Sequence, residues 1–280
     1  MEPLTATGCT PDLLARLPEG LAAFRERPGL AYPLQMWRYA LDCARAGQAA
    51  PVDGTVNALP YVPEAVCALL PEGAALSVLD VGCLGGYGLF DFARRQPGRV
   101  LRLDGVDVDA DGIALARAMG ALWGAGALRL PAVAHIGFHA APAERLPFPD
   151  AAFDLVIARL LLPYVEVKAT LRELHRVAAP GGLLLVQTHA AGYYGRQLVR
   201  HCRDPRRLAY YSRPLFAGLL FRLTGRQPRA PRWREVALSR RHVLALCAQA
   251  GLACVWTDAN PSHGRPLLAF RNCQKFDENE

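Results

Sequence analysis

The chain of 280 residues is 52% hydrophobic and carries a formal net charge of +7. This length suits one large domain, or a core with an elaboration, and the composition supplies ample apolar material for a core. No apolar stretch reaches the roughly 18 residues of a membrane-span candidate, and the first residues lack the basic and then apolar order of a secretory signal. We therefore expect a cytoplasmic protein without a membrane partner.

The cysteine and charge patterns narrow the class further. Eight cysteines occur without a C-x-x-C pair, which is typical of reduced, mostly buried thiols and argues against a zinc site. All but two of the 32 basic residues are arginine, which fits the codon bias of a GC-rich genome of bacterial type as much as selection for arginine chemistry. Residues 193–241 hold 13 arginines against two acids, Asp204 and Glu235, so one segment is basic while the rest of the chain is not.

The first region, residues 1–70, is predicted to be a helical N-terminal cap. Leu34, Trp37, Leu41 and Ala44 recur at helical spacing, which indicates an amphipathic helix. Proline and glycine interrupt the rest of this region, so its other parts are expected to be irregular.

Strands and helices are then predicted to alternate from residue 76 to residue 188. The expected strands are Leu76–Val81, Val100–Val108, Val133–His139, Asp154–Ala158 and Leu183–Thr188. The helical stretches between them lie near 89–95, 111–122 and 166–178. Alternation of this period predicts a parallel sheet with helices on both faces.

The Arg-rich segment, at about 190–238, interrupts this alternation. We expect two helices there, followed by the turn-rich stretch Gly225–Pro231. An N-capped helix is predicted over Ser239–Gly251, and two short strands over Leu252–Thr257 and Pro266–Phe270. The domain prediction is therefore a cap over 1–70 and a core over 71–280 that contains a basic helical insertion.

Residues 78–90 read VLDVGCLGGYGLF, an apolar strand that ends in four glycines within seven residues. Glycine permits positive φ and lets a ligand approach the backbone, and the next helix would point free N–H groups at the same place. The carboxylate of Asp80 at the strand tip favours an amino-bearing or cationic ligand over a phosphate.

A second carboxylate, Asp107, ends the second predicted strand. In doubly wound folds a carboxylate at this place accepts hydrogen bonds from both ribose hydroxyls of a nucleoside. Asp109 is expected to cap the following helix instead. The glycine turn and Asp107 together predict a nucleoside-bearing ligand across the carboxyl ends of the first two strands.

Four motifs resemble the class I S-adenosylmethionine-dependent methyltransferases, over roughly 76–188 with a continuation over 239–270. They are VLDVGC at 78–83, GVDVDADGIALAR at 105–117, AERLPFPDAAFDLVIA at 143–158 and LRELHRVAAPGGLLLVQTH at 171–189. The resemblance implies an α/β fold, a Rossmann-like doubly wound sheet of seven mostly parallel strands with an antiparallel last strand. The N-terminal helices and the inserted helices would then form a lid that selects the acceptor.

The resemblance also implies the cofactor, S-adenosylmethionine, and its product, S-adenosylhomocysteine. Asp80 would hold the methionine amino group, and Asp107 the ribose hydroxyls. The remaining positions implied by the resemblance are Gly82, Leu84 and Gly86 beneath the methionine and ribose, Val108 on the adenine face, and Ala143 and Glu144 at the adenine edge. Leu84 replaces the family's middle glycine and Pro142 its adenine-binding acid, and either change would loosen cofactor binding.

Three residues at predicted strand ends are candidates for acceptor chemistry. His189 ends the fifth strand and would act as a general base, because an ordinary histidine pKa lies near neutrality. Tyr193 would form a pocket wall, and Arg159 would bind an acceptor carboxylate or phosphate. A structural histidine and a surface arginine stay open as alternatives. No carboxylates are predicted at the strand ends that bind Mg²⁺ in metal-dependent relatives, so we expect no catalytic metal.

The sequence thus predicts metal-independent methyl transfer to a small-molecule acceptor, of the kind made in specialised biosynthesis. Two alternatives stay open within the fold, namely an RNA methyltransferase that uses the Arg-rich insertion and a protein that binds the cofactor without transferring methyl. A nicotinamide dehydrogenase would share the glycine turn but not Asp80 or the Ala-Pro-Gly-Gly block. We do not expect nucleic acid as the partner, and a homodimer stays open.

Overall fold

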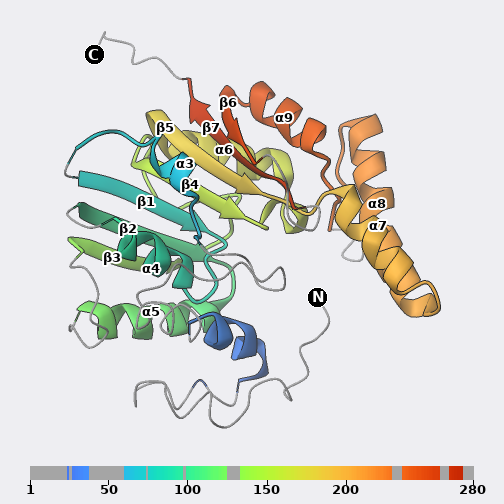
Figure 1. Ribbon diagram of the computed structural model, residues 1–280, viewed down its shortest axis with the longest axis horizontal. Coiled ribbons are helices and arrows are strands. Elements are labelled where there is room, and N and C mark those ends of the chain that lie inside the picture. The colour runs from blue at the N-terminus through green and yellow to red at the C-terminus, as the bar shows by residue number, and fades with distance from the viewer. Residues whose placement is uncertain are drawn as a thin grey trace. The chain divides into compact units, whose positions relative to one another are not determined.

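The computed structural model describes residues 24, 27–37, 60–73, 75–96, 99–124, 133–228, 235–258 and 265–273 (Figure 1). The chain divides into two compact units. The first unit comprises Met1–Cys67 and Glu72–Pro142, and the second comprises Ala68–Pro71 and Ala143–Glu280. No helix in the described ranges is both long enough and apolar enough to cross a bilayer.

The first unit is built on three parallel strands in the order β3-β2-β1. The strands are β1 Ala75–Val81, β2 Val100–Asp107 and β3 His135–Ala140. The helices are the short η3 Pro28–Leu30 and α3 Glu64–Cys67, with α4 Tyr87–Arg94 and α5 Ala110–Gly124. From Leu76 onward β1 is buried at almost every position, as expected of a strand that is covered on both faces.

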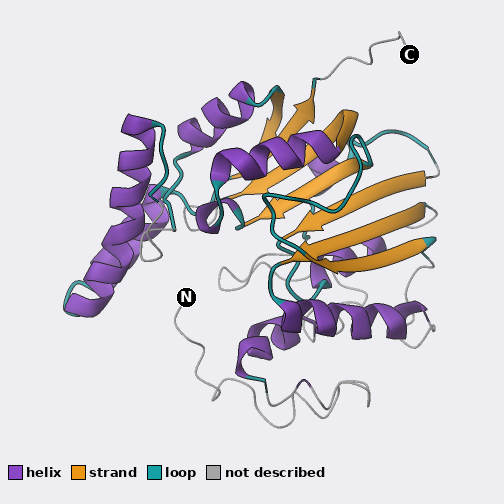
Figure 2. Cartoon of the chain, turned by 180° about the vertical axis from the view of Figure 1, so that it is seen from behind, coloured by secondary structure: helices purple, strands orange, loops and turns teal. Residues whose placement is uncertain are grey.

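The second unit carries four strands in the order β4-β5-β7-β6. Its elements are β4 Phe153–Arg159, η4 Leu162–Tyr164, α6 Val167–Val177, β5 Ala178–Gln187, α7 Ala191–Arg200, α8 Pro205–Thr224, α9 Arg240–Gln249, β6 Leu252–Thr257 and β7 Leu267–Asn272. β4 and β5 are parallel, and β7 runs antiparallel to both β5 and β6. Figure 2 shows strands and helices by colour.

The predicted fold class is confirmed, since the seven strands follow the order β3-β2-β1-β4-β5-β7-β6 and the last strand is antiparallel. Two predicted caps are confirmed as well. The Asp111 amide donates to Asp109 Oδ1 (3.0 Å) at the start of α5, and the His242 amide donates to Ser239 Oγ (3.2 Å) at the start of α9. Local polar side chains thus set these helix starts.

The Arg-rich insertion forms two helices, as predicted. Asp204 caps α8 by accepting hydrogen bonds from the amides of Arg206 (2.9 Å) and Arg207 (3.2 Å). Gly225 ends the helix with φ of 68°, a left-handed conformation in which glycine carries no penalty. The following segment, 229–234, lies outside the described residues.

The Ala-Pro-Gly-Gly block differs from its prediction. α6 ends at Val177 and β5 begins at once at Ala178, five residues before the expected start. Between Phe153 and Leu155 on β4 the register moves from Ala178 to Leu183, so the Pro-Gly-Gly residues form a bulge inside the strand. Gly181 takes a φ of 75°, which glycine permits without strain.

The N-terminal prediction is described only in part. Residues 31–37 are helical and include Leu34 and Trp37, both buried. Leu41 and Ala44, on which the longer helix was predicted, lie outside the described residues.

Candidate cofactor and acceptor sites

The glycine turn of the first unit is held by the end of β2. The amides of Gly82 and Cys83 both donate to the Val106 carbonyl, at 2.8 and 3.1 Å. The Leu84 amide donates to Asp107 Oδ2 at 2.8 Å. The turn after β1 and the acid after β2 therefore form one hydrogen-bonded structure, as the spacing of the two motifs predicts.

Leu84 adopts the conformation that a glycine would supply at its position. Its φ is +48°, between Gly82 at +80° and Gly86 at +79°. A left-handed conformation costs a residue with a Cβ about 1–2 kcal/mol, and the hydrogen bond to Asp107 helps to hold it there. The departure from the family's glycine pattern thus leaves the shape of the turn intact.

Asp107 presents an ordered carboxylate at the carboxyl end of β2. Besides the Leu84 amide, it accepts a hydrogen bond from the Asp109 amide at Oδ1 (2.9 Å). A carboxylate oxygen has two acceptor positions, so each oxygen retains capacity for a ligand hydroxyl. The next side chain, Val108, is 78% exposed. These residues fit a ribose with an adjoining flat base, the roles that the resemblance implies.

Asp80 is fully buried and accepts a hydrogen bond from the Tyr61 hydroxyl at 3.2 Å. The Tyr61 amide donates to Asp91 Oδ2 at 2.8 Å, so this tyrosine is fixed at both ends. A Cβ on Gly88 would lie 2.4 Å from the Tyr61 ring. Sequence reasoning missed Tyr61. Gly88, the fourth glycine of the turn and one without a ligand role, was the signal that a bulky group approaches there.

The N-terminal helical residues pack on the same turn. The Trp37 indole N–H donates to the Gly85 carbonyl, and the Trp37 ring meets Phe90 edge-on at 5.1 Å. Arg27 forms an ion pair with Asp111 at the start of α5. Residues 27–37 therefore help to position the glycine turn.

In the second unit His189 lies among tyrosines directly after β5. It is 6% exposed, stacks on Tyr193 with ring centroids 4.3 Å apart, and meets Tyr194 edge-on. Burial, and after it the charge of Arg265, lowers the pKa of His189 to about 3. The expectation of a pKa near neutrality is therefore wrong, because a buried imidazole is costly to protonate.

Glu235 fixes one of the tyrosine hydroxyls near this histidine. It accepts a hydrogen bond from the Tyr194 hydroxyl at 2.7 Å. Burial, and after it the charge of Glu235, raises the pKa values of Tyr164 and Tyr194. The Tyr164 oxygen lies 3.4 Å from His189 Nδ1. In the tautomer with the proton on Nδ1, His189 donates to Tyr164 and Nε2 keeps a lone pair.

Sequence reasoning did not connect Tyr164 and Glu235 with His189. The signal for Glu235 was its position as one of two acids in an arginine-rich segment. An isolated acid among so many cations is a candidate for a specific partner.

Arg159 is buried at the end of β4, where its Nε donates to Gln187 Oε1 at 3.0 Å. Arg159 and Gln187 are register partners in the parallel β4–β5 pair. The alternative of a surface arginine is therefore wrong. Its predicted role toward an acceptor anion stays a prediction.

Ala143 and Glu144, the predicted adenine-edge residues, belong to the second unit. Ala143 is buried. Glu144 Oε1 accepts a hydrogen bond from the Glu166 amide at 2.9 Å, at the start of α6. This bond orients Glu144, and its role at the adenine edge stays a prediction.

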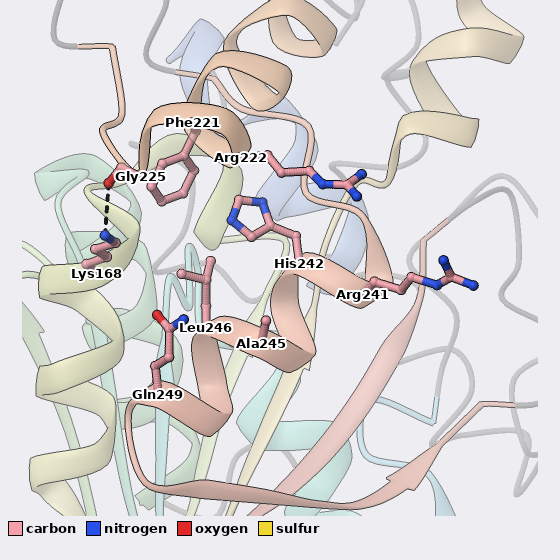
Figure 3. Close-up of a pocket in the computed structure, with 9 residues that line it drawn as sticks. All are labelled: Lys168, Phe221, Arg222, Gly225, Arg241, His242, Ala245, Leu246 and Gln249. Atoms are coloured by element: carbon pink, nitrogen blue, oxygen red, sulfur yellow. Dashed lines mark hydrogen bonds between the residues drawn. The ribbon is translucent and has the colours of Figure 1, made fainter.

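A separate cavity of about 380 Å³ lies in the second unit (Figure 3). Lys168, Arg222 and Arg241 line it together with apolar side chains, and no acid does. The His242 ring lies beside the Phe221 ring, with the ring centroids 5.0 Å apart (Figure 3). None of the predicted site residues lines this cavity. Within the described ranges no three or more His, Cys, Asp or Glu side chains are grouped to hold a metal ion.

Comparison with known proteins finds a family match for the middle of the chain. Residues 79–186 match the family model described as a methyltransferase domain. This part of the chain, which carries the four sequence motifs, is therefore similar to a class I S-adenosylmethionine-dependent methyltransferase domain. S-adenosylmethionine is the cofactor that this family and fold imply, and the residues around Asp107 fit it.

Curated relatives match this chain over less than half of either length. Ajmaline N-methyltransferase from Rauvolfia serpentina is 27% identical over 42% of this chain and 38% of its own. Malonyl-[acyl-carrier protein] O-methyltransferase from Serratia marcescens is 33% identical over 41% and 39%. The chain thus spans less than half the length of these relatives.

Solved structures share the methyltransferase fold at low identity. A SAM-dependent methyltransferase from Methanosarcina mazei aligns with 76% of this chain and 99% of its own, with a TM-score of 0.52 and 17% identity. The [4+2]-cyclase SpnF aligns with 86% and 94%, with a TM-score of 0.53 and 17% identity. At this identity the likeness shows the fold alone.

Proposed function

We propose that this protein transfers the methyl group of S-adenosylmethionine to a small-molecule acceptor without a metal ion. When bound, the cofactor supplies an electrophilic methyl group on a positively charged sulfur, and S-adenosylhomocysteine is the product. The observation that carries the proposal is the Asp107 carboxylate, which the Leu84 and Asp109 amides hold at the end of β2 with ligand capacity remaining.

The chain's own residues would contribute mainly by positioning, which suits a displacement that needs little acid–base help. Asp107 would hold the ribose, Val108 the adenine face, and Asp80 with its Tyr61 partner the methionine end. The side chains of Leu84 and Glu144 would border the cofactor. Each role rests on family resemblance together with the local geometry described above.

The acceptor would bind beside the aromatic group of Tyr164, His189, Tyr193 and Tyr194. Flat aromatic side chains suit a small acceptor with an apolar or aromatic body. His189 Nε2 is a buried nitrogen without a hydrogen-bond partner in the described part of the chain. Its lone pair would accept a hydrogen bond from the acceptor's O–H or N–H and so align the attacking atom.

The low pKa of His189 makes it a poor general base. It would align the acceptor by accepting a hydrogen bond rather than take up its proton, because the imidazolium is disfavoured in this buried place. Arg159 would then pair with an acidic group on the acceptor. Cytoplasmic location and a homodimer stay predictions from the sequence.

The test combines binding and product formation. Calorimetry is expected to show S-adenosylmethionine and S-adenosylhomocysteine binding, weakened at least tenfold in Asp107→Asn, since the amide would present a donor where an acceptor is needed. Asp109→Asn is the matched control, because asparagine also caps helices, and its affinity is expected to stay within twofold.

Formation of S-adenosylhomocysteine with small-molecule acceptors, and not with RNA transcripts, would support the proposal. Binding of NADH without S-adenosylmethionine would overturn it. Cofactor binding without product for any acceptor favours a non-methylating role, and a methylated transcript favours the RNA alternative.

A further inference from the structure

The solvent-facing side of α8 is apolar. Leu223 is 75% exposed, Phe216 58% and Leu219 52%, and Leu220 is exposed as well. The described residues include nine exposed large hydrophobic side chains, of which six lie on α7 and α8. Scattered exposed hydrophobics need no explanation, but a concentration on one helix pair indicates a binding surface.

These side chains lie opposite the face by which α8 is anchored. At 3.6 residues per turn, positions 216, 219, 220 and 223 form a stripe about 100° wide. The buried positions of the helix, namely Tyr211, Pro214, Ala217, Gly218 and Phe221, fall on the other side. A Cβ on Gly218 would lie 2.2 Å from the Ala237 carbonyl oxygen, so the backbones are in close contact there. The helix cannot roll to bury its leucines without breaking this contact.

The charge beside the stripe is uniformly positive. α8 contains no acid, and Arg213, Arg222 and Arg226 are exposed along it or just beyond its end. The two acids of the segment serve local purposes, since Asp204 caps α8 and Glu235 accepts the Tyr194 hydroxyl. α7 adds exposed Arg196 and Arg200.

The cavity of Figure 3 extends this basic surface at the C-terminal end of α8. Arg222 and Gly225 belong to α8 and its cap, and Lys168 and Arg241 come from α6 and α9. Lys168 Nζ donates to the Gly225 carbonyl at 2.8 Å. Lys168, Arg222 and Arg241 therefore add positive charge at this end of α8, and no acid lines the cavity.

We propose that the α7–α8 pair binds an anionic lipid surface. The apolar stripe formed by residues 216, 219, 220 and 223 would insert among the acyl chains, and the arginines would lie at the headgroup phosphates. An exposed row of apolar side chains with flanking arginines is the pattern of helices that lie in a membrane interface. The proposal is independent of the methyl transfer proposed above, and it revises the expectation of no membrane partner.

The experiment measures flotation of the full-length protein with vesicles of two compositions. One is pure phosphatidylcholine, and the other contains equal parts phosphatidylcholine and phosphatidylglycerol. We expect binding to the anionic vesicles at least tenfold stronger than to the neutral ones. The double variant Leu219→Gln, Leu223→Gln is expected to lose at least tenfold, while Val255→Gln, an exposed apolar position on β6, stays within twofold.

Glutamine is a good helix former, so the double variant should fold, and circular dichroism together with cofactor affinity checks this. No flotation of the wild type would overturn the proposal. So would flotation that the leucine change leaves intact, because that indicates arginine adsorption alone. Self-association that the double variant abolishes, without flotation, would show that a second copy covers the stripe.

Discussion

Asp107 has a structural task as well as its proposed ligand. Its two oxygens hold the Leu84 and Asp109 amides, which fixes the glycine turn to the start of α5. Loss of this carboxylate would therefore disturb the turn even without a cofactor. A substitution that keeps one acceptor oxygen, such as asparagine, separates the two tasks better than alanine does.

His189 is predicted to make the free energy of unfolding depend on pH. Its pKa is about 3 when folded against an ordinary 6.5, so below pH 6.5 the unfolded chain binds more protons. Stability is then lost progressively as pH falls from 6.5 toward 3. Between pH 6.5 and 5.5 the expected loss is about 1 kcal/mol.

Urea unfolding at several pH values measures this loss. His189→Phe keeps an aromatic ring beside Tyr193 and cannot titrate. Its free energy of unfolding should therefore change less with pH than that of the wild type. The remaining slope would come from groups such as His175 and His242, whose pKa values burial also lowers. Equal slopes in the wild type and His189→Phe would contradict the burial argument.

Residues with local or strand-end roles were predictable from the sequence. Asp109 is two positions from its amide partner, and Asp107 follows from where a strand ends. Tyr61 with Asp80, and Glu235 with Tyr194, join positions 19 and 41 residues apart. Such pairs depend on tertiary packing, which periodicity does not encode, and the same packing moved the pKa of His189.

At the scale of elements, α8 shows that a list of apolar residues does not tell which of them are buried. The inserted helix contains the aromatic and apolar residues Tyr211, Phe216, Leu219 and Phe221, and the resemblance places it in a lid over the acceptor. The helix divides them, with Tyr211 and Phe221 buried and the other two exposed. The helical spacing was present in the sequence, but two apolar faces on one helix leave open which of them is anchored.

Gly218→Ala is predicted to loosen α8. The new Cβ would lie 2.2 Å from the Ala237 oxygen, a backbone atom that cannot rotate away. We expect a loss of about 2–3 kcal/mol in the free energy of unfolding, with weakening of the hydrogen bond from the Ala237 amide to the Pro214 carbonyl (2.9 Å).

Gly195→Ala on α7 is the matched control for this change. No atom lies within 4 Å of its new Cβ, so helix propensity alone predicts a gain of about 0.5–1 kcal/mol. Urea unfolding measures both variants. A shift of the same sign in both would contradict the assigned close contact.

At the scale of the whole molecule, the fold was predicted mainly from the order of strands and helices along the chain. Alternating strands and helices predicted the parallel strands, and the motifs predicted the antiparallel last strand. The start of β5 was the main boundary error, because Pro180 and two glycines are typical of a turn and here form a bulge. The division into two units, with predicted cofactor residues in both, had no sequence signal.

Cofactor binding should raise the stability of the folded chain by mass action. A ligand that binds only the native state adds about 2.7 kcal/mol at one hundred times its Kd, so saturating S-adenosylhomocysteine should raise the Tm by several degrees. Asp107→Asn should reduce this shift at the same ligand concentration. NADH should give none, because Asp80 and the neighbouring turn offer no phosphate cradle.

If the residues of both units hold the cofactor, a single unfolding transition should move as a whole. Movement of only one of two transitions would confine binding to one unit, and an equal shift with NADH would overturn the cofactor assignment.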